Sequence, residues 1–414
     1  MLSPEIRCVV GIDVAKQAHV VCAVEAPSGA IRHKPSRIEA SAEGFTLLCS
    51  WLATWGAPQQ IVIGLEATGP LWEPLCEHLT HAGYTVLVLN PRQTASWAAS
   101  LGLRAKTDGI DAHTLARGLL AGLARASTLP SESVQALRTL TRARRDLIQH
   151  RTATRQRLHD DLVTLFPEFV GFLPTLPGRH DLGAPAVLTL LSRYSSAQAL
   201  AQVALDELTT TLDHLSEGRW GAAQAQALQA LAQRSTASSR ALAARSLVAR
   251  TLAQQLQELA LHVAEVEAAI AALLQDDADG QRLQDLPGIG PQTAATIRAE
   301  LGDVARFACV DEVVAYAGLD PRTYQSGAFL GQKHLSKRGP GALRHALYLA
   351  AFVAARCAPE WHERYQRLLD RGRAKKEAFT ILARALLRVI FHLLRTGEPY
   401  DPAVLKPPSA PTAA

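Results

Sequence analysis

Two apolar runs near the start of the chain end alike, with a glycine and then an acid two positions later. They are CVVGID, which ends at Asp13, and IVIGLE, which ends at Glu66. Short apolar runs of this kind are typical of buried strands. Further strands are expected over 19–29, 30–40 and 85–90, and helices over 43–56 and 70–84. Strands that first follow one another and then alternate with helices predict a mixed α/β sheet covered on both faces.

The composition changes at about residue 131, where strand patterns end and Ala, Leu, Gln and Arg become frequent. This predicts an all-α remainder. A heptad seam with alternating four- and three-residue steps indicates a coiled-coil helix. Its members are Leu252, Leu256, Leu259, Val263, Val266, Ile270 and Leu273. That helix needs a partner, which is either the basic helix at 131–165 or a second subunit.

The predicted organisation therefore has four parts. Residues 1–130 form the α/β domain, and 131–280 form the coiled-coil region with a helical insertion at about 166–235. Residues 281–400 form a helical C-terminal domain, and the Pro- and Ala-rich tail 401–414 is expected to be disordered.

Composition excludes several classes of protein. The sequence has no run of about eighteen uncharged apolar residues and no signal-peptide pattern at its start, so we expect a cytoplasmic protein without membrane contact. The six cysteines are scattered and form no CxxC pair, which argues against a disulfide framework or a zinc site.

Basic residues gather in clusters rather than spreading evenly over a chain of net charge +5. Clusters fit a polyanion partner, although a solvated helix face is the plain alternative. The candidates for nucleic-acid contact in the basic helix are Arg138, Arg142, Arg145, Arg151 and Arg155, and those in a later loop are Arg322, Lys337, Arg338 and Arg344.

Four carboxylates occur where a metal site would need them. Asp13 and Glu66 end strands, and Asp108 and Asp111 open the helix that follows KTDGIDA. Strand ends and one helix converge in a ribonuclease-H-like domain, and carboxylate oxygens suit Mg²⁺ or Mn²⁺. One alternative is that the two helical acids are ordinary first-turn residues, which the dipole at a helix N-terminus stabilises. Another is that GIDVAK belongs to an actin-like kinase.

Two further segments suggest DNA chemistry. LQDLPGIGPQTAATIRAELG resembles a helix-hairpin-helix, in which Gly288, Gly290 and Thr293 would face a DNA phosphate; a plain helical corner is the alternative. Downstream, Tyr324, Ser326 and Ser336 are hydroxyl nucleophiles among cations, as covalent phosphoryl transfer requires. Spacing does not rank these three.

The order of motifs resembles the DEDD-type insertion-sequence transposases, which are bridge-RNA-guided recombinases. The matching segments are GIDVAK, GLEATG, NPRQTASWAASLGLRAKTDGIDA, LPGIGPQTA, YAGLDPRTYQSG and LSKRGPGALRHALYLAA. They cover the chain to about 160 and from about 280 to 400.

The resemblance implies a RuvC-like ribonuclease-H domain whose metal ligands map to Asp13, Glu66, Asp108 and Asp111, and a serine nucleophile that maps to Ser326. It also implies a noncoding bridge RNA, donor and target DNA, and a homo-oligomer, a dimer that becomes a tetramer in the synaptic complex. Such a bacterial enzyme would associate with the nucleoid when active. The competing interpretations are a hydrolytic junction-resolving nuclease, an actin-like kinase and an inactive nucleic-acid-binding protein.

Overall fold

The chain divides into two compact units, residues 1–129 and 130–414. The computed structural model describes residues 3–67, 69–89, 91, 94, 95, 97, 107–123, 130–178, 180–322, 325, 326, 329, 330 and 334–402.

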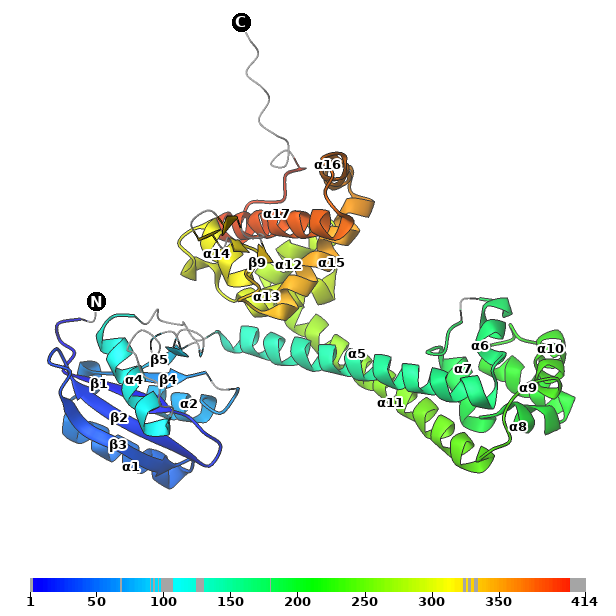
Figure 1. Ribbon diagram of the computed structural model, residues 1–414, viewed down its shortest axis with the longest axis horizontal. Coiled ribbons are helices and arrows are strands. Elements are labelled where there is room, and N and C mark those ends of the chain that lie inside the picture. Colours follow the sequence, from blue (N-terminus) through cyan, green and yellow to red (C-terminus); the bar gives the residue numbers. More distant parts are fainter. Residues whose placement is uncertain are drawn as a thin grey trace, which may run out of the picture. The chain divides into compact units, whose positions relative to one another are not determined.

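A five-stranded sheet forms the centre of the first unit, in the order β3-β2-β1-β4-β5. Its strands are β1 (Cys8–Asp13), β2 (Ala18–Glu25), β3 (Ile31–Glu39), β4 (Ile61–Glu66) and β5 (Thr85–Leu89). The first three strands pair antiparallel as a meander, whereas β4 and β5 join β1 in parallel. The predicted mixed α/β sheet is therefore confirmed (Figure 1).

Helices cover both faces of this sheet because side chains alternate along each strand. Val10 and Ile12 pack with Leu48 of α1 (Ala42–Trp55) and Leu75 of α2 (Glu73–His81). Val9 points to the opposite face and packs with residues of α4 (Asp108–Leu120). Residues at odd positions of β1, including Gly11 and Asp13, thus share the α4 face.

Two long helices organise the second unit. α5 (Glu132–Leu165) and α11 (Leu242–Gln275) pack along each other, and most of the α11 seam is buried in this chain. The partner left open by the sequence is thus α5. A helical cluster built around Trp220 connects them. Its elements are α6 (Phe169–Phe172), η2 (Leu173–Thr175), α7 (Pro185–Arg193), α8 (Ala197–Gln202), α9 (Leu205–Leu215) and α10 (Ala222–Gln233).

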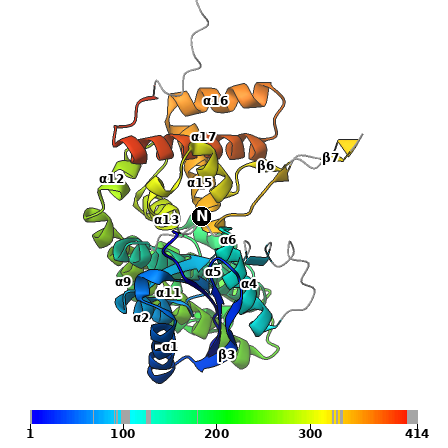
Figure 2. The same ribbon diagram turned by 90° about the vertical axis from the view of Figure 1, so that its left-hand side faces the viewer.

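The C-terminal helices share one apolar core that contains Leu343, Trp361 and Leu386. The helices are α12 (Ala278–Gln284), α13 (Pro291–Leu301), α14 (Val310–Ala317), α15 (Gly341–Cys357), α16 (Pro359–Asp370) and α17 (Lys375–Thr396). Figure 2 shows α16 lying alongside α17, and the two helices are in contact. Short strand pairs lie between α14 and α15: β6 (Pro321–Arg322) with β9 (His334–Leu335), and β7 (Gln325–Ser326) with β8 (Phe329–Leu330).

Over the part of the chain that the structure describes, none of the helices has the length and apolar character needed to cross a bilayer. Most of the tail expected to be disordered, from residue 403 onward, lies outside the described residues.

Candidate active site and nucleic-acid interface

Asp13 and Glu66 lie at the same edge of the sheet. β1 and β4 are parallel neighbours whose last paired residues are Ile12 and Leu65, so the two acids directly follow a matched pair. Both also lie two positions beyond register partners, Gly11 and Gly64, and therefore on the same face of the sheet. The carboxyl edge of two parallel strands thus presents both acids on the α4 face.

The missing side chains of Gly11 and Gly64 allow α4 to lie directly on this face. A Cβ on Gly11 would stand 2.1 Å from the Ala112 carbonyl oxygen, and one on Gly64 would stand 2.4 Å from Leu119 Cδ1. Asp111 precedes Ala112, so the close approach brings the first turn of α4 to β1. The repeated pattern of glycine followed by an acid therefore combines a helix-docking position with a strand-end carboxylate.

The start of α4 is fixed by its own cap, and its last turns pack on an aromatic side chain. The Thr107 hydroxyl accepts a hydrogen bond from the Ile110 backbone N–H at 3.3 Å, so the helix begins at Asp108 with Asp108 and Asp111 in its first turn. Farther along, the Trp97 ring occupies the space beside Gly118, where a Cβ would lie 2.2 Å from a ring carbon. Asp108 is exposed and Asp111 is half-buried.

Glu66 contacts a residue that the sequence reasoning missed. The Thr94 hydroxyl lies 3.0 Å from Glu66 Oε2 and 2.9 Å from the Pro91 carbonyl oxygen, which share its single proton, and Thr94 is buried. Thr94 belongs to the segment NPRQTASW, which contributed to the family resemblance but carried no assigned role. The contact involves one carboxylate oxygen of Glu66 and leaves the other oxygen to act elsewhere.

The carboxylates supply the oxygen donors that divalent Mg²⁺ or Mn²⁺ prefers, and the two glycines bring their supporting elements together. Within the described residues, however, no three His, Cys, Asp or Glu side chains are grouped closely enough to hold a metal ion. Asp13 and Glu66 thus share one sheet face, and Asp108 and Asp111 open the helix that packs on that face, without forming a closed ligand set among the described residues.

The candidate nucleophiles lie in the second unit. Ser326 lies in β7 opposite Phe329, whereas Tyr324 lies outside the described residues. The Ser336 hydroxyl donates to the Asp320 carboxylate, and the Ser336 N–H donates to the Asp320 carbonyl oxygen at 3.0 Å. Ser336 therefore closes the loop between α14 and α15.

The cations near this loop differ in role. Arg344 Nη1 donates to the carbonyl oxygens of Ala317 and Gly339, at 3.2 and 2.6 Å, which ties α15 to the end of α14. Lys337 is exposed and has a φ of 50°, a left-handed conformation that is uncommon for lysine. Arg338 is also exposed, and Arg322 lies in β6 opposite His334.

The PGIG turn has one half-buried, closely packed glycine and one exposed glycine. Gly288 has a φ of 81°, and a Cβ there would lie 2.3 Å from the Ala350 carbonyl oxygen, so glycine is required for packing on α15. Gly290 is the N-cap of α13, is exposed, and would have nothing within 4 Å of a Cβ. Thr293, in the first turn of α13, is half-buried.

Two of the candidate arginines for nucleic-acid contact also bind α13. Arg142 forms a bidentate pair with Glu300, with Nε to Oε1 at 3.0 Å and Nη2 to Oε2 at 3.1 Å, and Glu300 is only 2% exposed. Arg138 Nε donates to the Ala299 carbonyl oxygen at 3.0 Å. Partial burial is the main cause that lowers the pKa of Arg138. Both side chains thus attach α5 to α13.

The other candidate arginines of α5 are also at least partly exposed. Arg145 contacts its neighbour Asp146 at 3.3 Å, and Arg155 pairs with Asp181 at 3.2 Å, with both pairs exposed. Arg151 is half-buried and has no hydrogen-bond or ion-pair partner within the described part of the chain. Exposed pairs of this kind are weak and are readily exchanged for a phosphate.

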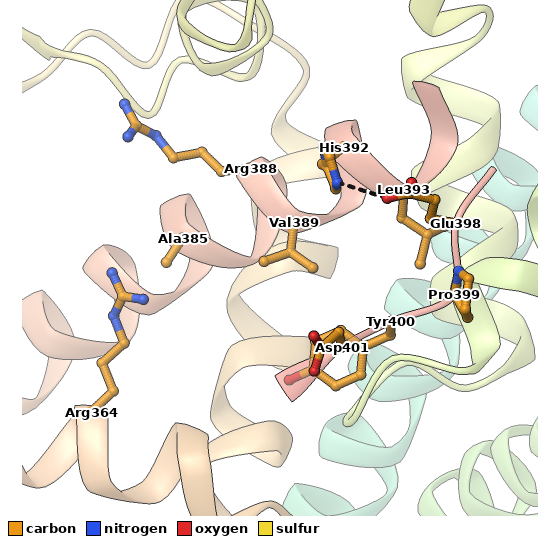
Figure 3. Close-up of a pocket in the computed structure, with 10 residues that line it drawn as sticks. All are labelled: Arg364, Ala385, Arg388, Val389, His392, Leu393, Glu398, Pro399, Tyr400 and Asp401. Atoms are coloured by element: carbon orange, nitrogen blue, oxygen red, sulfur yellow. Dashed lines mark ion pairs between the residues drawn. The ribbon is translucent and has the colours of Figure 1, made fainter. Parts of the chain in front are cut away.

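A pocket of about 290 Å³ between α16, α17 and the segment that follows them contains a cation the sequence reasoning also missed. Figure 3 shows the guanidinium groups of Arg364 and Arg388 at one end and residues 398–401 at the other, where His392 pairs with Glu398. Arg388 pairs with Asp311 at 2.9 Å, whereas Arg364 has no such partner among the residues described. Partial burial and the charges of Arg367 and Arg388 lower the pKa of Arg364.

The chain matches two family models. One, described as a transposase of the DEDD type named for IS110, matches residues 10–167. The other, described as the transposase IS116/IS110/IS902 family, matches residues 280–366. These ranges include the acid-bearing domain and the segment with the PGIG turn and Ser326.

Curated relatives extend the similarity over the whole chain. The 44.8 kDa protein of insertion element IS116 from Streptomyces clavuligerus is 27% identical over 413 residues, which is 98% of each chain. The transposase for insertion sequence element IS1328 of Yersinia enterocolitica is 24% identical over 83% of each. The pilin gene-inverting protein of Moraxella bovis is 31% identical over 29% of this chain and 38% of its own. The chain belongs to the IS110-type family of insertion-sequence transposases.

Proposed function

We propose that this transposase is an RNA-guided DNA recombinase that excises and inserts its element through a covalent serine intermediate. The DEDD-type domain implies dependence on a divalent metal, and a transposase acts on DNA. The proposal also assigns the reaction to particular residues. The observation that carries it is the convergence of Asp13, Glu66 and the first turn of α4 on one sheet face, enforced by Gly11 and Gly64.

In the proposed reaction, the Ser326 hydroxyl attacks a DNA phosphodiester. A bond forms between Ser326 Oγ and phosphorus, the bond from phosphorus to the 3′ oxygen breaks, and that oxygen leaves as a 3′-hydroxyl after taking a proton. The product is a 5′-phosphoserine link. Strand exchange followed by the reverse attack rejoins the ends. The energy of the broken phosphodiester bond is kept in the phosphoserine link, so no cofactor is needed to supply it.

The acids act on the same phosphate. Asp13, Glu66, Asp108 and Asp111 would hold Mg²⁺ or Mn²⁺, which when bound neutralises charge that develops on the reacting phosphate. Thr94 contacts one Glu66 oxygen, and the cap at Thr107 keeps the two helical acids at the start of α4. The protein's contribution is to bring carboxylates together whose mutual repulsion would otherwise separate them.

Nucleic-acid contact is assigned to side chains that remain accessible. Gly290, at the open start of α13, suits a backbone phosphate in a helix-hairpin-helix, with Thr293 in the same turn. Arg145, Arg151 and Arg155 are the candidates on α5 for RNA or DNA backbone, and Arg364 adds a cation without a carboxylate partner in the described C-terminal helices. Arg142 stays in this set because its side chain is 51% exposed beside Glu300, whereas Arg138 is assigned to the contact with α13.

The salt dependence of RNA binding tests the role of α5. Replacing Arg151 and Arg155 with glutamine should reduce the slope of log affinity against log salt by about one for each phosphate that the variant no longer neutralises. The matched control is Arg245→Gln, a half-buried arginine on α11 outside the proposed set. An unchanged slope in the double variant would remove α5 from the interface.

The acids lie in the first unit and Ser326 lies in the second. This separation suggests an active site shared between subunits, in which the paired helices α5 and α11 form a coiled-coil arm. Mixing Asp13→Ala protein with Ser326→Ala protein should restore part of the activity if a dimer or tetramer shares its sites. If each chain carries its own complete site, the mixture stays inactive.

The proposed function as a whole is tested by a recombination assay in bacterial cells. The element's DNA junction, its noncoding RNA and the wild-type protein should together give insertion at the programmed target. Asp13→Asn, Glu66→Gln and Ser326→Ala should each abolish insertion at equal protein levels. Insertion without the RNA would contradict RNA guidance, and insertion by the Ser326→Ala protein would contradict the serine assignment.

A further inference from the structure

A second hollow opens at the end of the sheet that carries the acids, on the α1 and α2 side. Its volume is about 610 Å³. The loop after β1 supplies Lys16, β2 supplies His19, α1 supplies Phe45, and α2 supplies His78. Lys16 follows Asp13 by three residues, so a ligand in this groove would lie next to the strand end that carries the acid.

His19 forms part of the wall and offers a hydrogen-bond donor. It is 2% exposed, and its Nδ1 accepts the Ala15 backbone N–H at 3.3 Å. Because a ring nitrogen that accepts an N–H carries no proton itself, the proton of the neutral ring must be on Nε2. Burial lowers the pKa of His19, which keeps the ring neutral. No acceptor for the Nε2 proton is present among the described residues.

Phe45 gives the groove an aromatic surface. Its ring stacks on His19 with centroids 5.9 Å apart and an interplanar angle of 22°, and it contacts His78 at 5.6 Å. Phe45 is half-buried, so part of its ring remains accessible. The groove thus offers three groups that bind a nucleotide. The accessible ring can stack on a base, the fixed N–H can donate a hydrogen bond to an acceptor atom of that base, and the exposed lysine can pair with a phosphate.

The histidines of this groove are not arranged as a metal site, because no metal-binding group of three His, Cys, Asp or Glu side chains exists within the described residues. Glu77 is the acid that lines the groove, and it lies on exposed helix surface beside His81. The chemistry of the walls therefore favours a neutral aromatic ligand with a single anionic group.

We propose that this groove holds one unpaired nucleotide of the strand that crosses the acid-bearing edge of the sheet. Its base stacks on Phe45 and accepts a hydrogen bond from His19 Nε2–H, and its phosphate lies near Lys16. The site rests on the proposed function, since it places the nucleotide beside the phosphate assigned to Asp13 and Glu66. Its role would be to hold a neighbouring base out of the stack and so fix the position of the reacting phosphate.

Paired changes in the protein and in the bases of the bound DNA test the site. The probes are a 12-nucleotide single-stranded thymidine oligonucleotide and a fully abasic oligonucleotide of the same length, bound to the full-length protein in EDTA and measured by fluorescence anisotropy. Phe45→Leu should reduce the preference for the oligonucleotide with bases on the order of 10-fold, as expected when one base no longer stacks on an aromatic ring. Lys16→Gln should weaken binding of both probes alike.

Trp51→Leu is the matched control, because Trp51 is a half-buried aromatic on the same helix but outside the groove. It should keep the wild-type preference, and all variants should have the wild-type circular dichroism spectrum. An unchanged preference in Phe45→Leu, or no binding of either probe to the wild-type protein, would overturn the nucleotide site. Because EDTA prevents metal-dependent chemistry, failure of the serine mechanism would leave this result unaffected.

Discussion

Replacing Gly11 with alanine tests whether α4 must lie directly on the sheet for the acids to act together. The new Cβ would be 2.1 Å from the Ala112 carbonyl oxygen and 2.5 Å from the Ala116 nitrogen, both backbone atoms that no side-chain rotation can move. Because carbon and oxygen approach to about 3.3 Å at closest, α4 must retreat by roughly 1 Å. Overpacking of this kind costs about 1–3 kcal/mol of stability. A misplacement of about 1 Å in a catalytic constellation costs about 100-fold in rate.

Hydrogen exchange measured by mass spectrometry should show faster exchange in α4 of Gly11→Ala while β1 and β4 remain protected. Recombination should fall on the order of 100-fold. Gly171→Ala is the control, because a Cβ there meets nothing within 4 Å and its backbone is helical. Wild-type exchange in α4 together with wild-type activity in Gly11→Ala would refute the idea that helix docking positions the acids.

Three further predictions concern the second unit. Gly288→Ala places a Cβ 2.3 Å from a backbone oxygen of α15 and should lower its free energy of unfolding in urea by about 1–3 kcal/mol, whereas Gly290→Ala, with nothing within 4 Å, should match wild type. Arg142→Gln leaves the buried Glu300 without its bidentate partner and should cost about 1.5–3 kcal/mol; an unchanged urea midpoint would contradict this. Partial burial acts to raise the pKa of Glu168, but hydrogen bonds from a serine and a threonine outweigh it and lower the pKa to about 2 from 4.5. Because the pKa of Glu168 is depressed in the folded state, its contribution to the free energy of unfolding is present above pH 4.5 and is lost as the pH falls toward 2. The thermal unfolding of Glu168→Gln should lack this pH dependence.

Local pattern was enough to predict the sheet. Strands covered on both faces must be apolar along most of their length, and this property is visible in runs such as CVVGID and IVIGLE. The heptad seam likewise predicted that the helix over 242–275 needs a partner. It did not identify α5, because which surface covers an apolar stripe depends on complementarity between segments far apart in the chain.

The site was less predictable where a role depends on a distant residue. Arg142 belongs to a run of basic residues, and nothing in that run reveals Glu300, which is 158 positions away. Thr94 is an ordinary helical threonine until β4 brings Glu66 within 3.0 Å of its hydroxyl. By contrast, the acids at the ends of β1 and β4 were predictable because a residue's place at a strand end follows from the strand alone.

In the proposed reaction, Ser326 forms a covalent link to DNA with help from the acids. The most direct measurement incubates the protein, its element RNA, Mg²⁺ and end-labelled junction DNA, and separates the products on a denaturing gel. We expect a slow-migrating protein–DNA band with wild-type protein that is absent with Ser326→Ala and with Asp13→Ala. Cleaved DNA without that band, retained in Ser326→Ala but lost in Asp13→Ala, would instead identify a hydrolytic nuclease and contradict the role of Ser326 as nucleophile.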